Sequence, residues 1–205
     1  FPRPLSNPGN EALRTEQLSV YKGGKGTRKL VDNVSLTLRR GEIVGVGGLQ
    51  GSGAEALFRA LFGVDPTYTT GRVFLDGRPF TPTSPADSIR NGLVLLTNDR
   101  KATGLVLSMT VVENMCIANL RALSKYGWRR PKAESASAVE MGRALQLRAA
   151  SYAMEVADLS GGNQQKVAIG KWLNTQPTIM LLDEPTRGVD VVAKQEIYRL
   201  MNSWT

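Results

Sequence analysis

The stretch Leu159-Ser160-Gly161-Gly162-Asn163-Gln164-Gln165-Lys166 decides the fold, together with Leu181-Leu182-Asp183-Glu184-Pro185 further along the chain. A glycine pair at the start of a helix can hold a phosphate on bare backbone N–H groups. An Asp-Glu pair that ends an apolar strand can bind a magnesium ion and orient a water molecule. Together the two stretches point to nucleoside triphosphate chemistry.

The first stretch predicts an amphipathic helix over 162–175. Ser160 is placed to cap this helix, and Gly161 and Gly162 leave its first N–H groups bare. An ordinary Ser-Gly-Gly helix start has the same pattern, so these residues alone leave the two interpretations even. The glutamine pair that begins at Gln164, with the acidic strand that follows, favours phosphate binding.

The acidic pair ends a predicted buried strand over 178–182. Ligands of open α/β sheets bind at this end of the strands. Asp183 would hold magnesium directly or through water, and Glu184 would polarise the attacking water. The alternative is a strand that ends in solvated acids. Asp190 then begins a last predicted helix, 191–204, at least as its N-cap.

An earlier loop, Gly48-Leu49-Gln50-Gly51-Ser52-Gly53-Ala54-Glu55, has the glycine spacing of a phosphate loop. Ala54 stands at the lysine position of that pattern, and Glu55 stands at its Ser/Thr position. The missing charge-assisted hydrogen bond is worth about 1.5–3 kcal/mol. A carboxylate about 5 Å from a phosphate costs about 3 kcal/mol at an effective dielectric near 20. The sequence therefore predicts ATP binding weakened roughly a thousandfold.

Glu55 falls in the first turn of the helix after this loop, where the helix dipole favours a negative charge. We expect the Glu55 carboxylate to occupy part of the position where a phosphate would bind. Residues 51–56 also match G-x-G-x-x-A, the dinucleotide fingerprint, with Asp76 as a downstream acid. The 159–166 and 181–185 stretches argue against that alternative, because a dinucleotide site needs neither of them.

Two further side chains are candidates for the site. Asn98 follows a predicted buried strand, 93–96, and either offers its amide oxygen to magnesium or serves as a turn residue. Tyr21 ends a predicted strand, 17–21, and can stack on an adenine. A plain strand-end tyrosine is the simpler interpretation of Tyr21.

Strands that alternate with helices predict an α/β fold with a largely parallel sheet. The remaining predicted strands are 34–38, 42–47 and 72–77, with 42–47 as a buried parallel strand. A helix with Leu57, Leu61 and Phe62 on one face follows the glycine loop, and from about 109 to 156 the pattern is helical with no strong strand. Residues 1–14 carry three prolines and little periodicity, which predicts a linker.

The residue composition limits the chemistry and the partners that we expect for this chain. The chain has no histidine, so this segment supplies no histidine base or ligand, and its single cysteine, Cys116, predicts a small core residue in a reducing compartment. The net charge of +8 is scattered, which favours a solvated basic surface over a nucleic-acid partner, with an anionic membrane surface the better specific alternative. Because the chain begins with Phe1 and Thr205 falls inside a predicted helix, we expect a piece of a longer polypeptide.

These motifs, in this order, resemble the nucleotide-binding domain of ABC transporters. The 159–166 stretch is similar to the form found in tandem ATP-binding subunits of bacterial monosaccharide importers, and Asn98–Leu105 resembles the segment that replaces their glutamine loop. Residues 47–53 are similar to the glycine loop of their C-terminal half. The resemblance begins at about Leu18.

The resemblance implies an ABC-type P-loop NTPase fold with a mainly parallel sheet, an antiparallel β subdomain and a helical subdomain over about 109–158. It implies that residues 15–205 form the nucleotide-binding domain, incomplete at its C-terminal end, with the family's switch histidine beyond Thr205. Two such domains, in one chain or as a dimer, pack head to tail around ATP and Mg²⁺.

In that arrangement Ser160, Gly161, Gly162 and Gln164 serve the partner's ATP, and the segment from Asn98 to about Trp128 faces membrane subunits. The implied function is ATP-driven sugar import at the cytoplasmic face of the inner membrane, with permease subunits, an indirect sugar-binding protein and no nucleic acid. We expect an ABC-type ATPase whose own site is impaired, with nucleotide-contacting residues Tyr21, Gly48, Gly51, Ser52, Gly53, Ala54 and Glu55. A non-catalytic regulatory domain and a soluble ATPase acting on nucleic acid are the alternatives.

Overall fold

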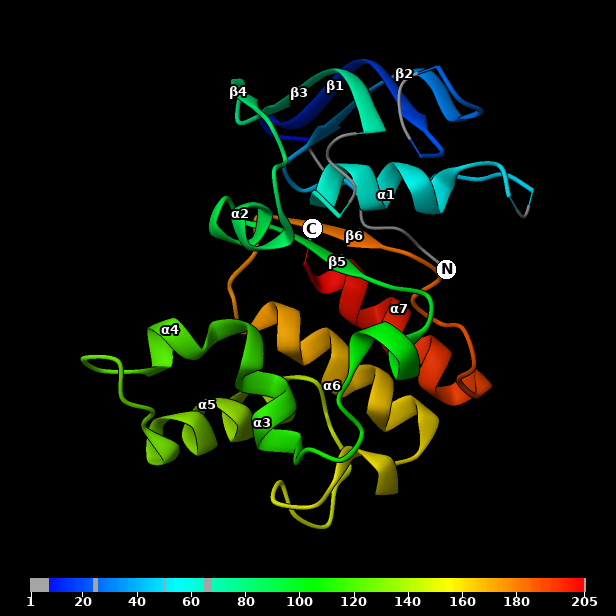
Figure 1. The fold of residues 1–205 in the computed structure, drawn as a ribbon. Helices are drawn as coiled ribbons and strands as arrows, with labels where there is room; N and C mark the ends of the chain where they lie inside the picture. Colours follow the sequence, from blue (N-terminus) through cyan, green and yellow to red (C-terminus); the bar gives the residue numbers. More distant parts are fainter. Residues whose placement is uncertain (1–7, 24–25, 50, 65–67, 205) are drawn as a thin grey trace. The chain divides into compact units, whose positions relative to one another are not determined.

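The computed structural model describes residues 8–23, 26–49, 51–64 and 68–204 (Figure 1). The chain divides into two compact units. The first contains the described residues up to Leu95 together with 178–181 and 202–204, and the second contains 96–177 and 182–201.

A four-stranded antiparallel sheet forms most of the first unit. Its order is β2-β1-β3-β4, with bounds β1 Glu11–Tyr21, β2 Lys29–Arg39, β3 Thr69–Leu75 and β4 Arg78–Phe80. The strands predicted over 17–21, 34–38 and 72–77 lie within these elements, the last of them running into the turn after β3. The antiparallel sheet expected from the family resemblance is therefore present.

The prediction of a linker over 1–14 is wrong at its C-terminal end, because β1 begins at Glu11. Ala12 and Leu13 are buried at 2% exposure, and Leu13 pairs with both neighbouring strands. Two apolar residues in a paired strand outweigh the proline-rich composition before them. Residues 1–7 of that prediction lie outside the described residues.

The first unit also contains helix α1 (Ala54–Phe62), helix α2 (Pro85–Arg90) and all but the last residue of strands β5 (Leu93–Leu96) and β6 (Ile179–Leu182). All four residues of β5 are buried, as predicted. Two backbone hydrogen bonds, Ile179 N to Gly92 O at 3.0 Å and Asp183 N to Leu96 O at 2.9 Å, advance together along both strands. The β5-β6 pair is therefore parallel.

The buried parallel strand predicted over 42–47 is wrong. Residues 42–48 have no regular structure, and Ile43, Val44 and Val46 are exposed at 48%, 40% and 45%. A buried strand needs hydrogen-bonded neighbours on its edges, and no described strand pairs with this segment. Glycines at 45, 47 and 48 further weaken the extended conformation because they add backbone entropy without a side chain to pack.

Helices form the second unit. They are η2 (Arg100–Gly104, a π-helical turn), α3 (Val111–Cys116), η3 (Ile117–Asn119), α4 (Leu120–Leu123), α5 (Pro131–Ala144), η4 (Val156–Asp158), α6 (Gly161–Leu173) and most of α7 (Val191–Ser203). Figure 1 shows α3 and α5 against α6. At their meeting point a Cβ on Gly170 would lie 2.9 Å from Leu145 and 3.2 Å from Met115, so a larger residue there requires these side chains to shift.

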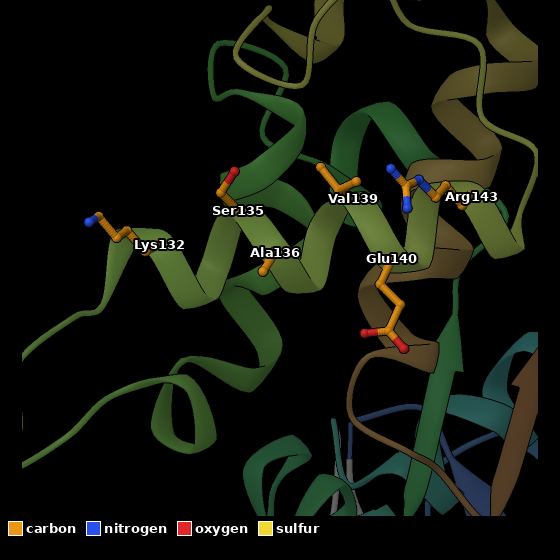
Figure 2. A pocket seen from close by; sticks show the side chains of 6 residues that line it. All are labelled: Lys132, Ser135, Ala136, Val139, Glu140 and Arg143. Carbon is orange, nitrogen blue, oxygen red and sulfur yellow. The ribbon is translucent and has the colours of Figure 1, made fainter.

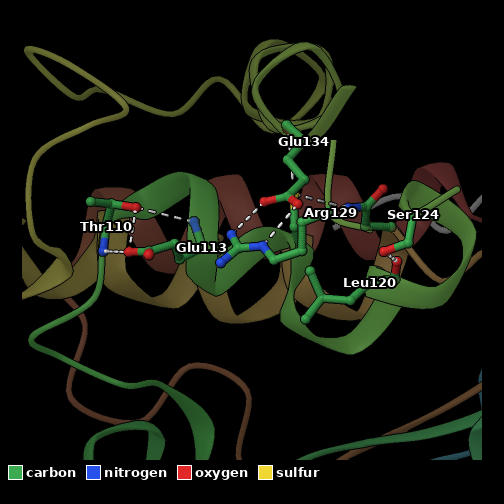
Figure 3. A network of polar contacts seen from close by, with 8 residues as sticks. Thr110, Glu113, Leu120, Ser124, Arg129 and Glu134 are labelled. Atoms are coloured by element: carbon green, nitrogen blue, oxygen red, sulfur yellow. Dashed lines mark hydrogen bonds and ion pairs between the residues drawn. The ribbon is translucent and has the colours of Figure 1, made fainter. Parts of the chain in front are cut away.

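A polar network orders the region between α3 and α5 (Figure 3). Thr110 and Glu113 form a reciprocal capping box at the start of α3. Arg129 binds the buried Glu134 through two bonds of 3.0 and 2.6 Å, which lowers the pKa of Glu134. Cys116 is fully buried, as predicted, and burial raises the pKa of its thiol to about 11.

The outer side of α5 carries a shallow pocket (Figure 2). Its lining comes from that helix alone: Lys132, Ser135, Ala136, Val139, Glu140 and Arg143. Side chains from one helix do not converge from several directions as in a ligand pocket, so we assign it no function.

Among the described residues, no helix has both the length and the apolar character that crossing a bilayer requires.

Candidate functional site

The described part of the glycine loop in the first unit is a turn with two glycines in the left-handed region. Ser52 N donates to Leu49 O at 2.9 Å, Gly51 has φ 82° and Gly53 has φ 101°. A Cβ on Gly53 would lie 2.1 Å from Leu30 O, so no other residue fits there. Gly48 is less constrained, because its Cβ would meet only the Ser52 side chain. Gln50 of the predicted motif lies outside the described residues.

Helix α1 begins at Ala54, directly after this loop. Glu55 is exposed in the first turn, as predicted. Neither residue supplies the ammonium or the hydroxyl of a complete phosphate loop. The loop therefore keeps the glycines of a phosphate loop without its cation and hydroxyl, and its contact with a triphosphate stays a prediction. Tyr21 is half-buried at the end of β1, and its adenine contact stays a prediction.

The start of α6 in the second unit has the geometry predicted for the 159–166 stretch. Ser160 is the N-cap, and its exposed hydroxyl accepts from the Asn163 backbone N at 3.5 Å and the Asn163 side-chain Nδ2 at 3.0 Å. Gly161 follows half-buried, and Gly162 is buried. The N–H groups of the first turn thus sit at a capped helix start without Cβ atoms at two positions, which suits an anionic group.

Gly162 has a second reason to be glycine, and it gives a testable result. A Cβ at this position would lie 2.6 Å from Ala193 Cβ, so α6 and α7 meet through the missing side chain. We expect Gly162→Ala to lower the free energy of unfolding by about 1–3 kcal/mol, because the helices must separate. Urea denaturation measures this. Gly45→Ala is the control, since a Cβ there meets nothing within 4 Å.

Two polar side chains after the glycine pair, Gln164 and Lys166, bond to other residues of the second unit. Gln164 is buried, and its Nε2 donates to Val156 O at 3.2 Å. Lys166 bonds Gln146 O at 2.9 Å and pairs with Glu196 at 2.7 Å, which lowers the pKa of Glu196. Gln164 is therefore a packing residue here, and its contact with a partner's ATP stays a prediction.

The turn after β6 carries the predicted acids. Glu184 adopts φ 45°, a left-handed conformation that costs a non-glycine residue about 1–2 kcal/mol. Arg187 N closes the turn on Glu184 O at 2.9 Å, and the two exposed side chains pair at 3.3 Å. Strain of this kind concentrates at functional sites. Asp190, predicted as a helix cap, accepts from Ala193 N at 2.9 Å at the start of α7.

Arg100 is the residue that sequence reasoning missed. Asp99 caps the η2 turn by accepting from Lys101 N and Ala102 N at 3.0 Å, and this orders Arg100. The Arg100 guanidinium then donates to Arg187 O at 2.9 Å and Gly188 O at 3.1 Å. Asn98 is half-buried just before this turn, and its role as a magnesium ligand stays a prediction.

Lys171 binds the last residue of η2. Its buried ammonium donates to Gly104 O at 2.5 Å, and burial lowers its pKa from 10.5 to about 8. Between these values the unfolded chain keeps a proton that the folded chain has lost, so unfolding becomes less favourable as pH rises from 8.

We therefore expect the free energy of unfolding, relative to Lys171→Met, to rise by about 1–2 kcal/mol between pH 7.5 and 9.5. Urea denaturation of both proteins at the two pH values measures the difference. An equal response of the two proteins to pH would contradict the assignment.

The family model described as "ABC transporter" matches residues 31–187. The chain belongs to the ABC transporter family. It is 41% identical to the xylose import ATP-binding protein XylG of Thermoanaerobacter pseudethanolicus and 43% identical to the ribose import ATP-binding protein RbsA of Geobacillus kaustophilus, each over 98% of this chain. It spans 40% and 39% of the length of these two relatives.

Solved structures agree with this family. A nucleotide-free ATP-binding cassette from an ABC transporter aligns with a TM-score of 0.78 and 27% identity, over 94% of this chain and 76% of that one. The ADP conformation of another ATP-binding cassette aligns with a TM-score of 0.75 and 27% identity, over 94% and 77%. The predicted ABC-type P-loop NTPase fold, with an antiparallel β sheet and helices, is confirmed. The mainly parallel sheet predicted with it is wrong for the described residues, because residues 42–47 form no strand and only β5 and β6 pair in parallel.

Proposed function

We propose that this chain is an ATP-binding domain of a bacterial monosaccharide importer, located at the cytoplasmic face of the membrane beside permease subunits. The single observation that supports this most is its 41–43% identity to ribose and xylose import ATP-binding proteins over nearly its whole length. A sugar-binding protein would act indirectly through the permease.

The domain works as one half of a pair. Ser160, Gly161 and the first turn of α6 present N–H groups to the triphosphate gripped by the partner's phosphate loop. Donors fixed by a capped helix need no rearrangement when charge develops on the terminal phosphate. Glu184 and Asp183 supply the base and the magnesium ligand for the nucleotide that this domain itself holds.

The domain's own site is the weaker one of the pair. The fit to a triphosphate is partial, because the loop of 48–53 gives backbone N–H groups while Ala54 and Glu55 remove the cation and the hydroxyl. Glu184 is present, so slow hydrolysis at this site remains part of the proposal. A non-catalytic regulatory domain is the second candidate, favoured by the same two substitutions.

Reconstitution with the permease tests the transport function. Proteoliposomes that contain the complete transporter should accumulate labelled ribose or xylose only with internal Mg-ATP, and the sugar with its binding protein should stimulate ATP hydrolysis. Stimulation by duplex DNA, with no response to any monosaccharide, would instead support an ATPase that acts on nucleic acid.

A further inference from the structure

We propose that Arg100 is a positioning residue for the partner's nucleotide: it fixes the start of α6 relative to the turn that follows Glu184. This inference rests on the proposed function of that helix start. All the residues that carry this inference belong to the second unit. None of the sequence motifs predicts the contacts that Arg100 makes.

Three glycines from separate segments surround the Arg100 side chain. A Cβ on Gly104 would lie 3.2 Å from Arg100 Cβ, and one on Gly188 would lie 3.4 Å from Arg100 Nη1. A Cβ on Gly161 would lie 3.0 Å from Arg100 Nη2 and 3.1 Å from Gly188 O. Each glycine thus leaves room for the arginine, and η2, the Gly188 turn and α6 meet around it.

The hydrogen bonds show what the guanidinium holds. Nη1 and Nη2 reach two successive carbonyls, those of Arg187 and Gly188, at 2.9 and 3.1 Å. These carbonyls lie between Glu184, the proposed base, and Asp190, which caps α7. The planar fork of arginine matches two neighbouring acceptors, whereas the single ammonium of lysine does not. Arg100 therefore fixes this turn in a way that lysine reproduces only in part.

The site also carries an energetic cost. Arg100 Nε is buried and has no hydrogen-bond partner among the described residues. An unsatisfied buried donor is unfavourable for stability, so an arginine kept for stability alone would be a poor choice here. The position of the guanidinium beside Gly161 explains it better: the same side chain that holds the Gly188 turn also forms the wall against which the first residue of α6 rests.

Steady-state ATP hydrolysis by the paired domains tests the proposal. We expect Arg100→Ala to lower kcat about tenfold and to leave the KM for ATP within about twofold, because the partner's loop grips the nucleotide and the helix start acts on its terminal phosphate. Arg100→Lys should recover part of the rate. Arg90→Ala, which removes an exposed arginine paired with Asp87 in the other unit, is the control.

Gly161→Ala keeps the test independent of the folding of Arg100→Ala. Its methyl group should displace Arg100 and lower kcat. Because Gly161 itself faces the nucleotide, part of this loss should persist in the Arg100→Ala background, but the loss there should be smaller than in the parent, since contacting residues are not additive. Amide hydrogen exchange in residues 187–190 should rise in Arg100→Ala.

The inference is overturned if Arg100→Ala matches Arg90→Ala in both exchange and kcat, or if the two substitutions are additive. The proposed function fails by a different result: full activity of a Ser160→Arg variant.

Discussion

Replacement of Ser160 by arginine is expected to reduce ATP hydrolysis by the paired domains at least about a hundredfold, the loss seen when a preorganised donor site for a developing oxyanion is removed. Ser160 is exposed at the N-cap of α6, and its hydroxyl accepts from Asn163 N and Nδ2. Arginine removes the cap and places a long side chain over the N–H groups of Gly161 and Gly162.

Two further variants distinguish the role of the Ser160 hydroxyl as a helix cap from the role of the N–H groups at the helix start. Ser160→Thr preserves the hydroxyl and should keep most of the activity. Ser160→Ala loses only the cap, so we expect a decrease in the free energy of unfolding of about 0.5–2 kcal/mol and a modest loss of rate. ATPase measurements on the purified pair give the answer. An active Ser160→Arg pair would mean that this helix start touches no nucleotide, as in a purely regulatory domain.

The double substitution Ala54→Lys with Glu55→Ser is expected to tighten ATP binding to this chain by roughly a thousandfold or more. It restores a charge-assisted hydrogen bond of about 1.5–3 kcal/mol and removes a repulsion of about 3 kcal/mol. Both residues lie in the first turn of α1, Glu55 exposed and Ala54 half-buried, while the buried residues of the helix are Leu57, Ala60, Leu61 and Phe62. The substitutions therefore leave the buried face of the helix unchanged.

Calorimetric titration of the isolated chain with Mg-ATP measures this gain. The single variants divide it: Glu55→Ser tests the repulsion and Ala54→Lys tests the missing cation. Glu140→Ser is the control, because it removes an exposed carboxylate from α5 in the other unit and leaves the loop unchanged. If the parent chain and the double variant bind ATP with equal affinity, Ala54 and Glu55 are not the cause of weak binding at this site.

Local patterns allowed much of the fold to be predicted. The strand over Leu93–Leu96 agrees with the structure residue by residue, and Ser160 and Asp190 cap their helices as expected. These features depend on neighbours in sequence: four apolar residues in a row, or a polar side chain just before a helix. The fold class followed from the order of the motifs and is confirmed by the family and by solved cassettes.

The failures arose where the outcome depends on contacts between distant segments. The apolar run 42–47 has the composition of a buried strand, but pairing requires neighbours that the pattern does not reveal. Arg100 could not be recognised because its partners, the carbonyls of Arg187 and Gly188, are backbone atoms almost ninety positions away. The signals in the sequence were the place of Arg100 in the Asn98–Leu105 segment, which resembles a segment of the family, and Asp99 directly before it, a residue type that caps turns.

Amide hydrogen exchange in the paired domains, with ATP bound and hydrolysis prevented, tests the central proposal most directly. We expect nucleotide to protect the amides of Gly161 and Gly162 strongly, and those of Gly51, Gly53 and Ala54 weakly, because the α6 helix start serves the partner's triphosphate. Strong protection over Gly51–Ala54 with no change at Gly161 and Gly162 would contradict it.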